Sequence, residues 1–279
     1  MKVLRADYAG ACYGVQRALD LAMSAADGGG EGASTLGPLI HNPQVVDELA
    51  ARGIRAVDDP AEVERGAVII RSHGVTPAVR RSVEARGLPI IDATCPHVAR
   101  AQKAAAELAQ SCACVVVVGE SGHPEVEGLV ACANEAGGRV IVASRPGDLP
   151  DEIPSPAGVV VQTTQTHEAF DAVVEELRRR GVELELRDTI CFATRQRQEA
   201  AAELAKTADA IVVIGGRNSS NTTRLAEICA ASCPRTHHIE KPSEIDPAWF
   251  DGCSVVGVTA GASTPESQIA AVIERLEKL

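Results

Sequence analysis

The chain has 279 residues, of which 45% are hydrophobic and 23% are charged. This composition is typical of a globular protein with a large apolar core, and it excludes a disordered or collagen-like chain. The formal net charge of −11 argues against binding to nucleic acid or an anionic membrane surface, because such binding depends on clustered lysine and arginine.

The sequence favours a cytoplasmic location. Its apolar runs are much shorter than the roughly 20 residues that span a bilayer, and its first residues lack the apolar core of a signal peptide. Thiols stay reduced in the cytoplasm, so nine cysteines favour metal or catalytic roles over disulfides. No C-x-x-C pair occurs, which excludes a zinc ribbon and a ferredoxin-type run of ligands.

The first part of the chain predicts alternating helices and strands. Cys12 precedes a predicted helix over residues 14–26, and a predicted strand over residues 35–40 leads to His41 and a helix from Gln44. A further strand, from residue 68, ends in a polar turn that contains His73. This alternation is typical of a parallel α/β sheet.

The rest of the chain repeats itself at an offset of 96 residues, without a gap. Cys95 aligns with Cys191, the segment AAAELA of residues 104–109 recurs at residues 200–205, and His123 aligns with Ser219. In both copies a strand over residues 90–95 or 186–191 leads to the cysteine, an Ala-rich helix, a buried strand and a polar turn. Later strands, over residues 159–164 and from residue 255, also end in polar turns.

We therefore predict three α/β units: residues 13–95, residues 96–191, and residues 192–279 together with an N-terminal strand in residues 1–12. Ligand sites in parallel sheets form at the carboxyl ends of the strands. Small, mostly parallel sheets related by a pseudo-threefold axis, in a trefoil, would bring three cysteines and several polar turns to one central cluster.

Three cysteines from three units favour a metal group over a disulfide, because a disulfide leaves one sulfur over. A zinc ion with an open position and a [4Fe–4S] cluster with one iron not ligated by protein both suit three thiolates. The remaining cysteines are expected to be ordinary core residues. They are Cys112, Cys114, Cys132, Cys229, Cys233 and Cys253.

Polar turns at predicted helix starts supply candidate catalytic and binding groups. His123 and Glu125 are suited to passing a proton to a leaving oxygen, although carboxylates at a helix start also offset the helix dipole. The turn of residues 215–222 is suited to a phosphate, or is a capped helix. His41 and His73 are suited to donating hydrogen bonds to an anion, or are structural. Neither a Walker A nor a G-x-G-x-x-G pattern is present.

Nine short motifs, in order, resemble those of the LytB/IspH family of 4-hydroxy-3-methylbut-2-enyl diphosphate reductases. They are GACYGVQRA (residues 10–18), IHN (40–42), RSHGV (71–75), DATCP (92–96), GHPEVEG (122–128), QTTQ (162–165), ICFAT (190–194), NSSN (218–221) and TAGAS (259–263). The opening motif departs from the family pattern, because Ala11 replaces a common Phe and Tyr13 occupies a normally small position. This departure concerns the packing beside Cys12.

The resemblance implies a cluster-dependent oxidoreductase of non-mevalonate isoprene biosynthesis. It removes the allylic hydroxyl of its substrate with two electrons and two protons, and leaves isopentenyl and dimethylallyl diphosphate. Cys12, Cys95 and Cys191 are implied as ligands of a [4Fe–4S] cluster, with Glu125 as the proton source and Thr163 and His123 in its relay. The residues implied to bind the diphosphate are His41, His73, His123, Thr163, Ser219, Ser220, Asn221 and Ser263, with Thr164 nearby.

The sequence contains no flavin or nicotinamide fingerprint, so the electrons are expected from a ferredoxin or a flavodoxin. Arg178–Arg180 and Arg80–Arg81 are candidate docking groups for an acidic donor, or are solvated helix faces. A redox sensor that binds a diphosphate metabolite without turnover is an alternative function. A zinc hydrolase with three cysteine ligands is a third, and it would need no electron donor.

Overall fold

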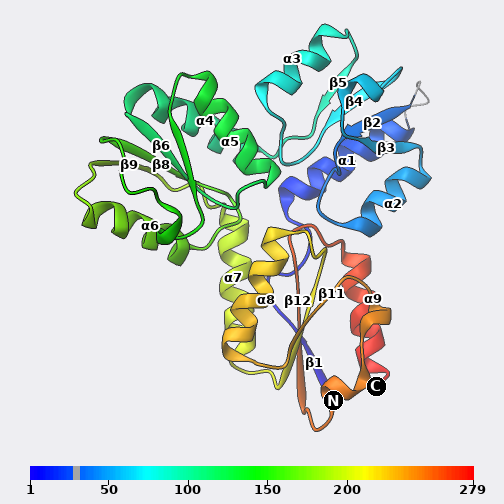
Figure 1. Cartoon of the computed structure of the whole chain (residues 1–279). Helices are drawn as coiled ribbons and strands as arrows, with labels where there is room; N and C mark the ends of the chain where they lie inside the picture. The colour runs from blue at the N-terminus through cyan, green and yellow to red at the C-terminus, as the bar shows by residue number, and fades with distance from the viewer. Residues whose placement is uncertain (28–31) are drawn as a thin grey trace. The chain divides into compact units, whose positions relative to one another are not determined.

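The computed structural model describes residues 1–27 and 32–279, and the described residues form nine α-helices and three four-stranded parallel sheets (Figure 1). The predicted α/β class with small parallel sheets is confirmed. Two compact units divide the chain. We call residues 1–15, 41–44 and 192–279 the terminal unit, and residues 16–40 and 45–191 the central unit. The predicted boundaries of three units, after residues 12, 95 and 191, remain a prediction, and residues 28–31 of the first lie outside the described chain.

The terminal unit contains one sheet in the order β1-β12-β10-β11. Its strands are β1 (Lys2–Arg5), β10 (Ala210–Ile214), β11 (Thr236–Ile239) and β12 (Val255–Ala260). Helices α7 (Phe192–Ala205) and α8 (Ser220–Ser232) pack with Ile211 and Val213 of β10, whereas α9 (Glu266–Glu277) packs with Val212 and Ile214. Both faces of the sheet are therefore covered, as the continuous apolar run of β10 requires.

The first sheet of the central unit has the order β3-β2-β4-β5. Its strands are β2 (Ala33–Leu36), β3 (Ile54–Val57), β4 (Ala67–Ile70) and β5 (Ile90–Asp92), and the helices near it in sequence are α1 (Tyr13–Asp27), α2 (Pro43–Ala51) and α3 (Pro77–Ala85). The predicted strand over residues 35–40 is wrong in its second half. Strand β2 ends at Leu36 because Gly37 has a φ of +69° and Pro38 has no N–H for a sheet ladder.

The second sheet of the central unit has the order β7-β6-β8-β9. Its strands are β6 (Cys114–Val118), β7 (Val140–Ala143), β8 (Ala157–Val161) and β9 (Leu184–Arg187). Helix α6 (His167–Arg179) packs against one face, and α4 (Pro96–Ser111) and α5 (Pro124–Glu135) pack against the other. All five residues of β6 are buried, and each buried valine stabilises the fold by about 1.5–3 kcal/mol.

The three sheets have one topology. In each sheet an edge strand, β3, β7 or β11, is followed by a short 3-10 helix that begins with proline. These helices are η1 (Pro60–Glu62), η2 (Pro146–Asp148) and η3 (Pro242–Glu244), and η4 (Pro247–Phe250) follows η3. The repeat seen in the sequence is therefore a repeat of strand order as well.

The leading strands are shorter than the sequence predicts. Strand β5 ends at Asp92 and β9 at Arg187, several residues before Cys95 and Cys191. An aspartate ends the ladder at the same place in both copies. Asp92 accepts a hydrogen bond from the Thr94 N–H, and Asp188 accepts one from the Ile190 N–H, each at 3.0 Å. These local turns carry the chain away from the sheet and toward the next helix.

Candidate active site

The three repeat cysteines share one position relative to the helices. Cys12, Cys95 and Cys191 directly precede α1, α4 and α7, and all three are half-buried. Cys95 occupies the N-cap of α4, and its side chain makes no capping hydrogen bond. The partial positive charge of a helix N-terminus favours a negatively charged ligand atom, so this position suits a thiolate that binds a metal group.

The other six cysteines lie in different surroundings. Burial is the largest cause that raises the thiol pKa of Cys112, Cys114 and Cys132, and it raises the pKa of Cys229 to about 12. Within the described chain no disulfide joins any of the nine cysteines. Cys114, Cys229 and Cys233 are buried, as expected of core residues, whereas Cys112, Cys132 and Cys253 are only half-buried.

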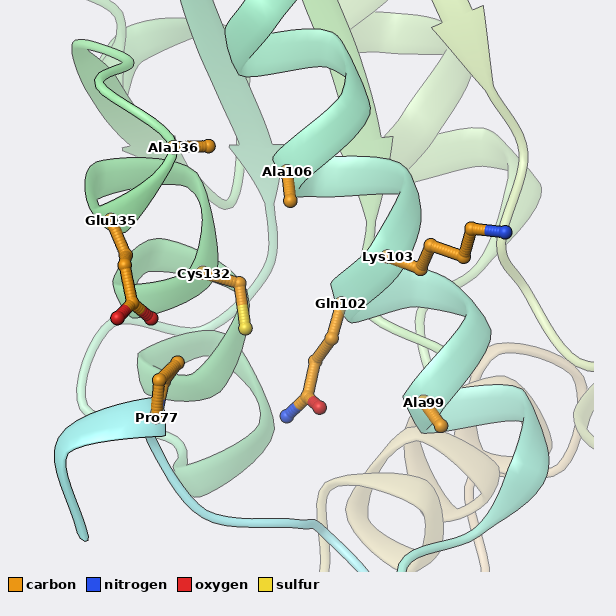
Figure 2. Close-up of a pocket in the computed structure, with 8 residues that line it drawn as sticks. All are labelled: Pro77, Ala99, Gln102, Lys103, Ala106, Cys132, Glu135 and Ala136. Carbon is orange, nitrogen blue, oxygen red and sulfur yellow. The ribbon is translucent and has the colours of Figure 1, made fainter. Parts of the chain in front are cut away.

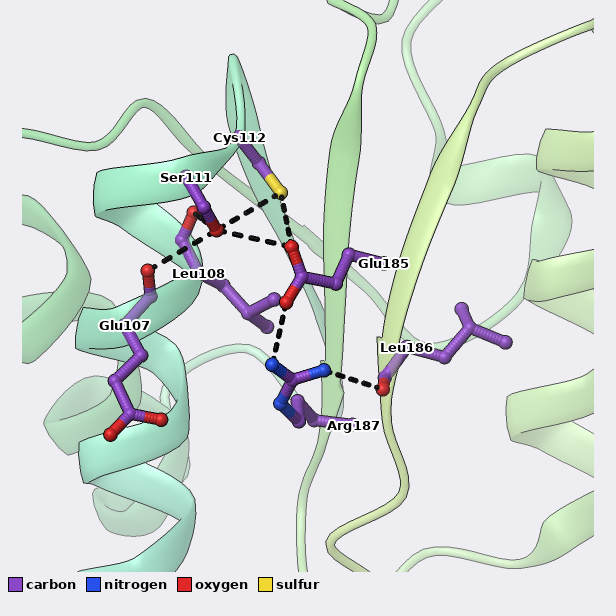
Figure 3. Close-up of polar contacts among 7 residues, drawn as sticks. All are labelled: Glu107, Leu108, Ser111, Cys112, Glu185, Leu186 and Arg187. Carbon is purple, nitrogen blue, oxygen red and sulfur yellow. Dashed lines mark hydrogen bonds and ion pairs between the residues drawn. The ribbon is translucent and has the colours of Figure 1, made fainter.

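Figure 3 shows the surroundings of Cys112, which lies at the C-terminal end of α4. Its thiol donates to Oε2 of Glu185 at 3.6 Å, and the hydroxyl of Ser111 donates to the same oxygen at 3.1 Å. Arg187 binds the other oxygen of Glu185 at 2.5 Å. The proximity of a carboxylate disfavours a thiolate at Cys112.

The central unit places Glu125 and Thr163 in direct contact. Glu125 lies in the first turn of α5 and is 1% exposed, and Thr163 follows β8 and is 5% exposed. The Thr163 N–H donates to Oε1 of Glu125 at 2.7 Å, and the Thr163 hydroxyl donates to Oε2 at 2.8 Å. Burial raises the pKa of Glu125 to about 7, although both hydrogen bonds from Thr163 act in the opposite direction.

His123 is the N-cap of α5 and a neutral imidazole at neutral pH. Its Nδ1 accepts a hydrogen bond from the Glu125 N–H at 3.1 Å, which places the ring proton on Nε2. Burial, and secondly the charge of Arg71, lowers the pKa of His123 to about 4. The ring lies edge-on to His73, with 5.6 Å between the ring centroids. Two predicted anion-binding histidines therefore lie side by side in the central unit.

Backbone hydrogen bonds attach two of the cysteines to these same turns. The Cys191 N–H donates to the carbonyl of Thr163 at 3.1 Å, and the Cys95 N–H donates to the carbonyl of Ser72 at 2.9 Å. The central unit thus brings together Cys95, His73, His123, Glu125, Thr163 and Cys191, all of which the sequence selects.

The terminal unit forms a second group of predicted site residues. The hydroxyl of Ser263 donates to the carbonyl of His41 at 3.0 Å, and the Cys12 N–H donates to the carbonyl of Ala262 at 3.1 Å. Ser219 is the N-cap of α8, where its hydroxyl accepts from the Thr222 N–H at 3.4 Å. The alternative interpretation of residues 215–222 as a capped helix is therefore confirmed, and the partial positive charge of this helix N-terminus favours an anion nearby.

Asn221, in the first turn of α8, has a buried side-chain amide that the described residues leave unpaired. It is 4% exposed, and neither Oδ1 nor Nδ2 has a hydrogen-bond partner among the described residues. Leaving a buried polar group unpaired costs about 1–3 kcal/mol, so native proteins rarely do so without a ligand or water. A polar ligand at the N-terminus of α8 removes this cost.

Three residues that were not predicted from the sequence make hydrogen bonds to the segments that carry proposed site residues. Asn42 is 2% exposed and donates to the carbonyl of Ser263, and Arg197 donates twice to the carbonyl of Gly10, two residues before Cys12. Gln162 is fully buried, accepts from the Glu120 N–H and donates to Thr164. Asn42 and Gln162 lie within the motifs IHN and QTTQ, whereas no motif contains Arg197.

Known proteins resemble this chain along its whole length. The sequence matches the family described as LytB protein over residues 3–277. Proteins named 4-hydroxy-3-methylbut-2-enyl diphosphate reductase from Geotalea uraniireducens and Pelobacter propionicus are both 47% identical to it over 281 residues. They cover 100% of this chain, which covers 98% and 99% of theirs. The chain belongs to the LytB protein family.

Solved structures agree with this assignment. A structure described as (E)-4-hydroxy-3-methyl-but-2-enyl diphosphate reductase, the terminal enzyme of the non-mevalonate pathway, is 40% identical, covers 100% of both chains and has a TM-score of 0.72. The E-1-hydroxy-2-methyl-but-2-enyl-4-diphosphate reductase from Plasmodium falciparum is 23% identical and shares the fold, with a TM-score of 0.89 over 98% of this chain and 87% of its own. In the described part of this chain, no helix is long and apolar enough to cross a membrane.

Proposed function

We propose that this chain is a 4-hydroxy-3-methylbut-2-enyl diphosphate reductase. It removes the allylic hydroxyl of (E)-4-hydroxy-3-methylbut-2-enyl diphosphate and forms isopentenyl and dimethylallyl diphosphate, the last step of the non-mevalonate isoprenoid pathway. The reaction consumes two electrons and two protons and releases the hydroxyl as water. Relatives that match almost the full length of the chain carry this name, which favours turnover over a sensor or a zinc hydrolase.

The buried pair of Glu125 and Thr163 is the observation that carries the proposal. The Thr163 N–H occupies Oε1 of Glu125, so a proton on Glu125 resides on Oε2, beside the Thr163 hydroxyl. When Glu125 is protonated, the hydrogen bond at Oε2 reverses, and the Thr163 hydroxyl accepts the proton from Glu125 as it passes its own proton to the leaving oxygen. A pKa of about 7 keeps a proton available on Glu125 at neutral pH, as a general acid requires.

We propose that Cys12, Cys95 and Cys191 hold a [4Fe–4S] cluster. Their shared position directly before helix N-termini suits thiolate ligands, in contrast to the six cysteines elsewhere, and all three are partly exposed. When bound, such a cluster supplies electrons one at a time and, at its iron without a protein ligand, Lewis acidity. The protein orients the substrate and delivers protons.

The diphosphate is proposed to bind to hydroxyl, amide and imidazole donors. Asn221 supports this assignment through its unpaired buried amide, and the N–H groups of α8 favour an anion there. His123 donates from Nε2, because Nδ1 already accepts from the backbone. The full proposed set is His41, His73, His123, Thr163, Ser219, Ser220, Asn221 and Ser263, with Thr164 nearby.

A ferredoxin or flavodoxin is proposed as the electron donor, acting in the cytoplasm. Ion pairs weaken the two candidate docking patches. Arg179 and Arg180 both bind Glu176 at 2.7 Å, and Arg80 binds Asp92 at 2.7 Å. Arg81 binds Glu135. An acidic donor therefore meets less positive charge at these arginines than the sequence suggests.

Product analysis tests the proposed function. The iron-loaded protein is incubated without oxygen with a chemical reductant and 4-hydroxy-3-methylbut-2-enyl diphosphate, and the diphosphates are separated by chromatography. We expect isopentenyl and dimethylallyl diphosphate to appear as the substrate disappears. Substrate that binds but is recovered unchanged would favour the sensor, and the formation of a hydrolysis product without a reductant would favour the zinc hydrolase.

A further inference from the structure

Gln102 touches two segments that carry proposed site residues. It lies on α4, two helical turns after Cys95. A Cβ placed on Gly128 would come within 2.6 Å of the Gln102 Nε2, and a Cβ placed on Gly74 would come within 2.9 Å of the same atom. Gly74 directly follows His73, and Gly128 lies three residues after Glu125 on α5. The carboxamide of Gln102 therefore lies against the backbones of both segments.

The carboxamide of Gln102 packs between two backbone segments. Its Nε2 is buried and has no hydrogen-bond partner among the described residues. Figure 2 shows Gln102 extending from α4 beside Cys132 of α5, at a pocket of about 410 Å³. A smaller hollow of about 190 Å³ is also lined by Gln102 and Cys132. Gln102 therefore lies close to the backbone of Gly74 and Gly128 and makes no hydrogen bond through Nε2 among the described residues.

We infer that Gln102 is a positioning residue for the reduction, a role that rests on the proposed function. Its side chain sets the separation between the turn of His73 and the first turns of α5, which carry His123 and Glu125. The two histidine rings lie 5.6 Å apart across this junction. A shorter side chain at residue 102 would let α5 move toward α4, and the proton donor and the anion-binding histidines would lose their alignment.

The internal repeat places a glutamine at the matching position of the other copy. Gln102 aligns with Gln198 at the 96-residue offset, in the matching turn of the matching helix. The glycine partners, however, belong to motifs of the central unit alone, at residues 74 and 128. The contact of Gln102 with Gly74 and Gly128 therefore occurs only beside the helix that carries Glu125.

A pair of substitutions tests the contact independently of activity. Gly128 has no positive φ, so Gly128→Ala suffers mainly from the clash with Gln102. The clashing atom is the far end of a flexible side chain, so we expect Gly128→Ala to lower the melting temperature only slightly, and Gln102→Ala in the same chain to remove that loss. An equal change in melting temperature with and without Gln102 would overturn the contact on which the inference rests.

Kinetics test the positioning role. We expect Gln102→Ala to lower kcat by about tenfold with little change in KM, because small misplacements of reacting groups cost rate. Gln102→Met, which keeps the reach of the side chain, should restore most of kcat. Lys103→Ala, at its exposed neighbour, should match the wild type.

The outcomes separate the two claims. A wild-type kcat in Gln102→Ala, or a defect in Gln102→Met as large as that in Gln102→Ala, would overturn the role as a spacer. A wild-type protein that forms no product would overturn the proposed function, whereas the melting temperatures would still measure the contact.

Discussion

At the scale of single residues, the site combines buried polar groups that a structural protein would avoid. Glu125 is a carboxyl with 1% exposure, and Asn221 is an amide with 4% exposure and no hydrogen-bond partner in the described chain. Such groups cost stability unless they serve a ligand or a reaction. Because of this stability cost, substitution of either residue should have a measurable effect.

Glu125 predicts a pH dependence of stability. Its pKa is about 7 in the folded protein and near 4.5 in the unfolded chain, so folding favours the protonated form. The free energy of unfolding contributed by Glu125 is thus fully present below about pH 4.5, and it is lost as the pH rises to about 7, by about 1.4 kcal/mol per unit of pKa difference.

Chemical denaturation at pH 5 and pH 7.5 measures this term. Glu125→Gln is always neutral, so we expect it to lose less stability than the wild type between the two pH values. Glu127→Gln, at an exposed position on the same helix, should behave like the wild type. The same pH slope in Glu125→Gln and the wild type would contradict the raised pKa.

We expect substitution of Asn221 to affect substrate binding much more than the stability of the fold. Asn221→Ala removes a buried amide that has no partner in the described chain, so the free energy of unfolding should change little. The KM for the diphosphate should rise about ten- to a hundredfold, the effect of losing one hydrogen bond to a charged group. Thermal melting and steady-state kinetics measure the two effects, with Thr223→Ala, exposed on the same helix, as the control. A large loss of stability with unchanged KM would show that Asn221 is structural.

The sequence analysis proposes residues that carry chemistry, and it misses residues that support them. His123, Glu125 and Thr163 stand in motifs whose residue types suggest a role. Arg197 does not, because its partner is the backbone carbonyl of Gly10, which is distant in sequence. A backbone acceptor leaves no mark in the residue pattern, so only the fold reveals this contact.

At the scale of elements, the site is built from strand-to-helix turns that recur in each sheet. The alternation of apolar runs and Ala-rich helices predicted these elements correctly, including the buried strands β6 and β10. The strand ends were predicted less well. Gly37 and Asp92 end their strands through a left-handed backbone and a side-chain hydrogen bond, which apolar periodicity does not report.

The position of three cysteines before helices predicts which thiols bind the cluster. Cys12→Ser, Cys95→Ser and Cys191→Ser should each lose most of the bound iron and the visible absorption of the protein. Cys112→Ser, at the end of α4 rather than at its start, should keep both. Iron and sulfide analysis of anaerobically purified variants measures this. Full iron content in any of the first three variants would remove that cysteine from the ligand set.

At the scale of the whole molecule, three sheets of one topology are distributed over two compact units. The 96-residue repeat predicted the two later copies, and the N-terminal strand β1 pairs with β12 at the far end of the chain. The two compact units do not coincide with the three copies of the sheet, because the central unit contains two of the sheets. Sequence similarity reports a shared local fold, whereas compactness depends on side chains between elements.

Each unit carries proposed site residues of its own. Glu125 and Thr163 belong to the central unit, and Asn221 and Ser263 belong to the terminal unit. We propose that these groups serve a reduction in which Glu125 supplies the proton.

Anaerobic oxidation of a reduced viologen dye by the iron-loaded protein tests this claim most directly. We predict that 4-hydroxy-3-methylbut-2-enyl diphosphate makes the wild type and Glu127→Gln bleach the dye. Glu125→Gln should bind the substrate without bleaching the dye. Bleaching by Glu125→Gln at the wild-type rate would contradict the role of Glu125, and no bleaching by a wild type with an intact cluster would contradict the reductase itself.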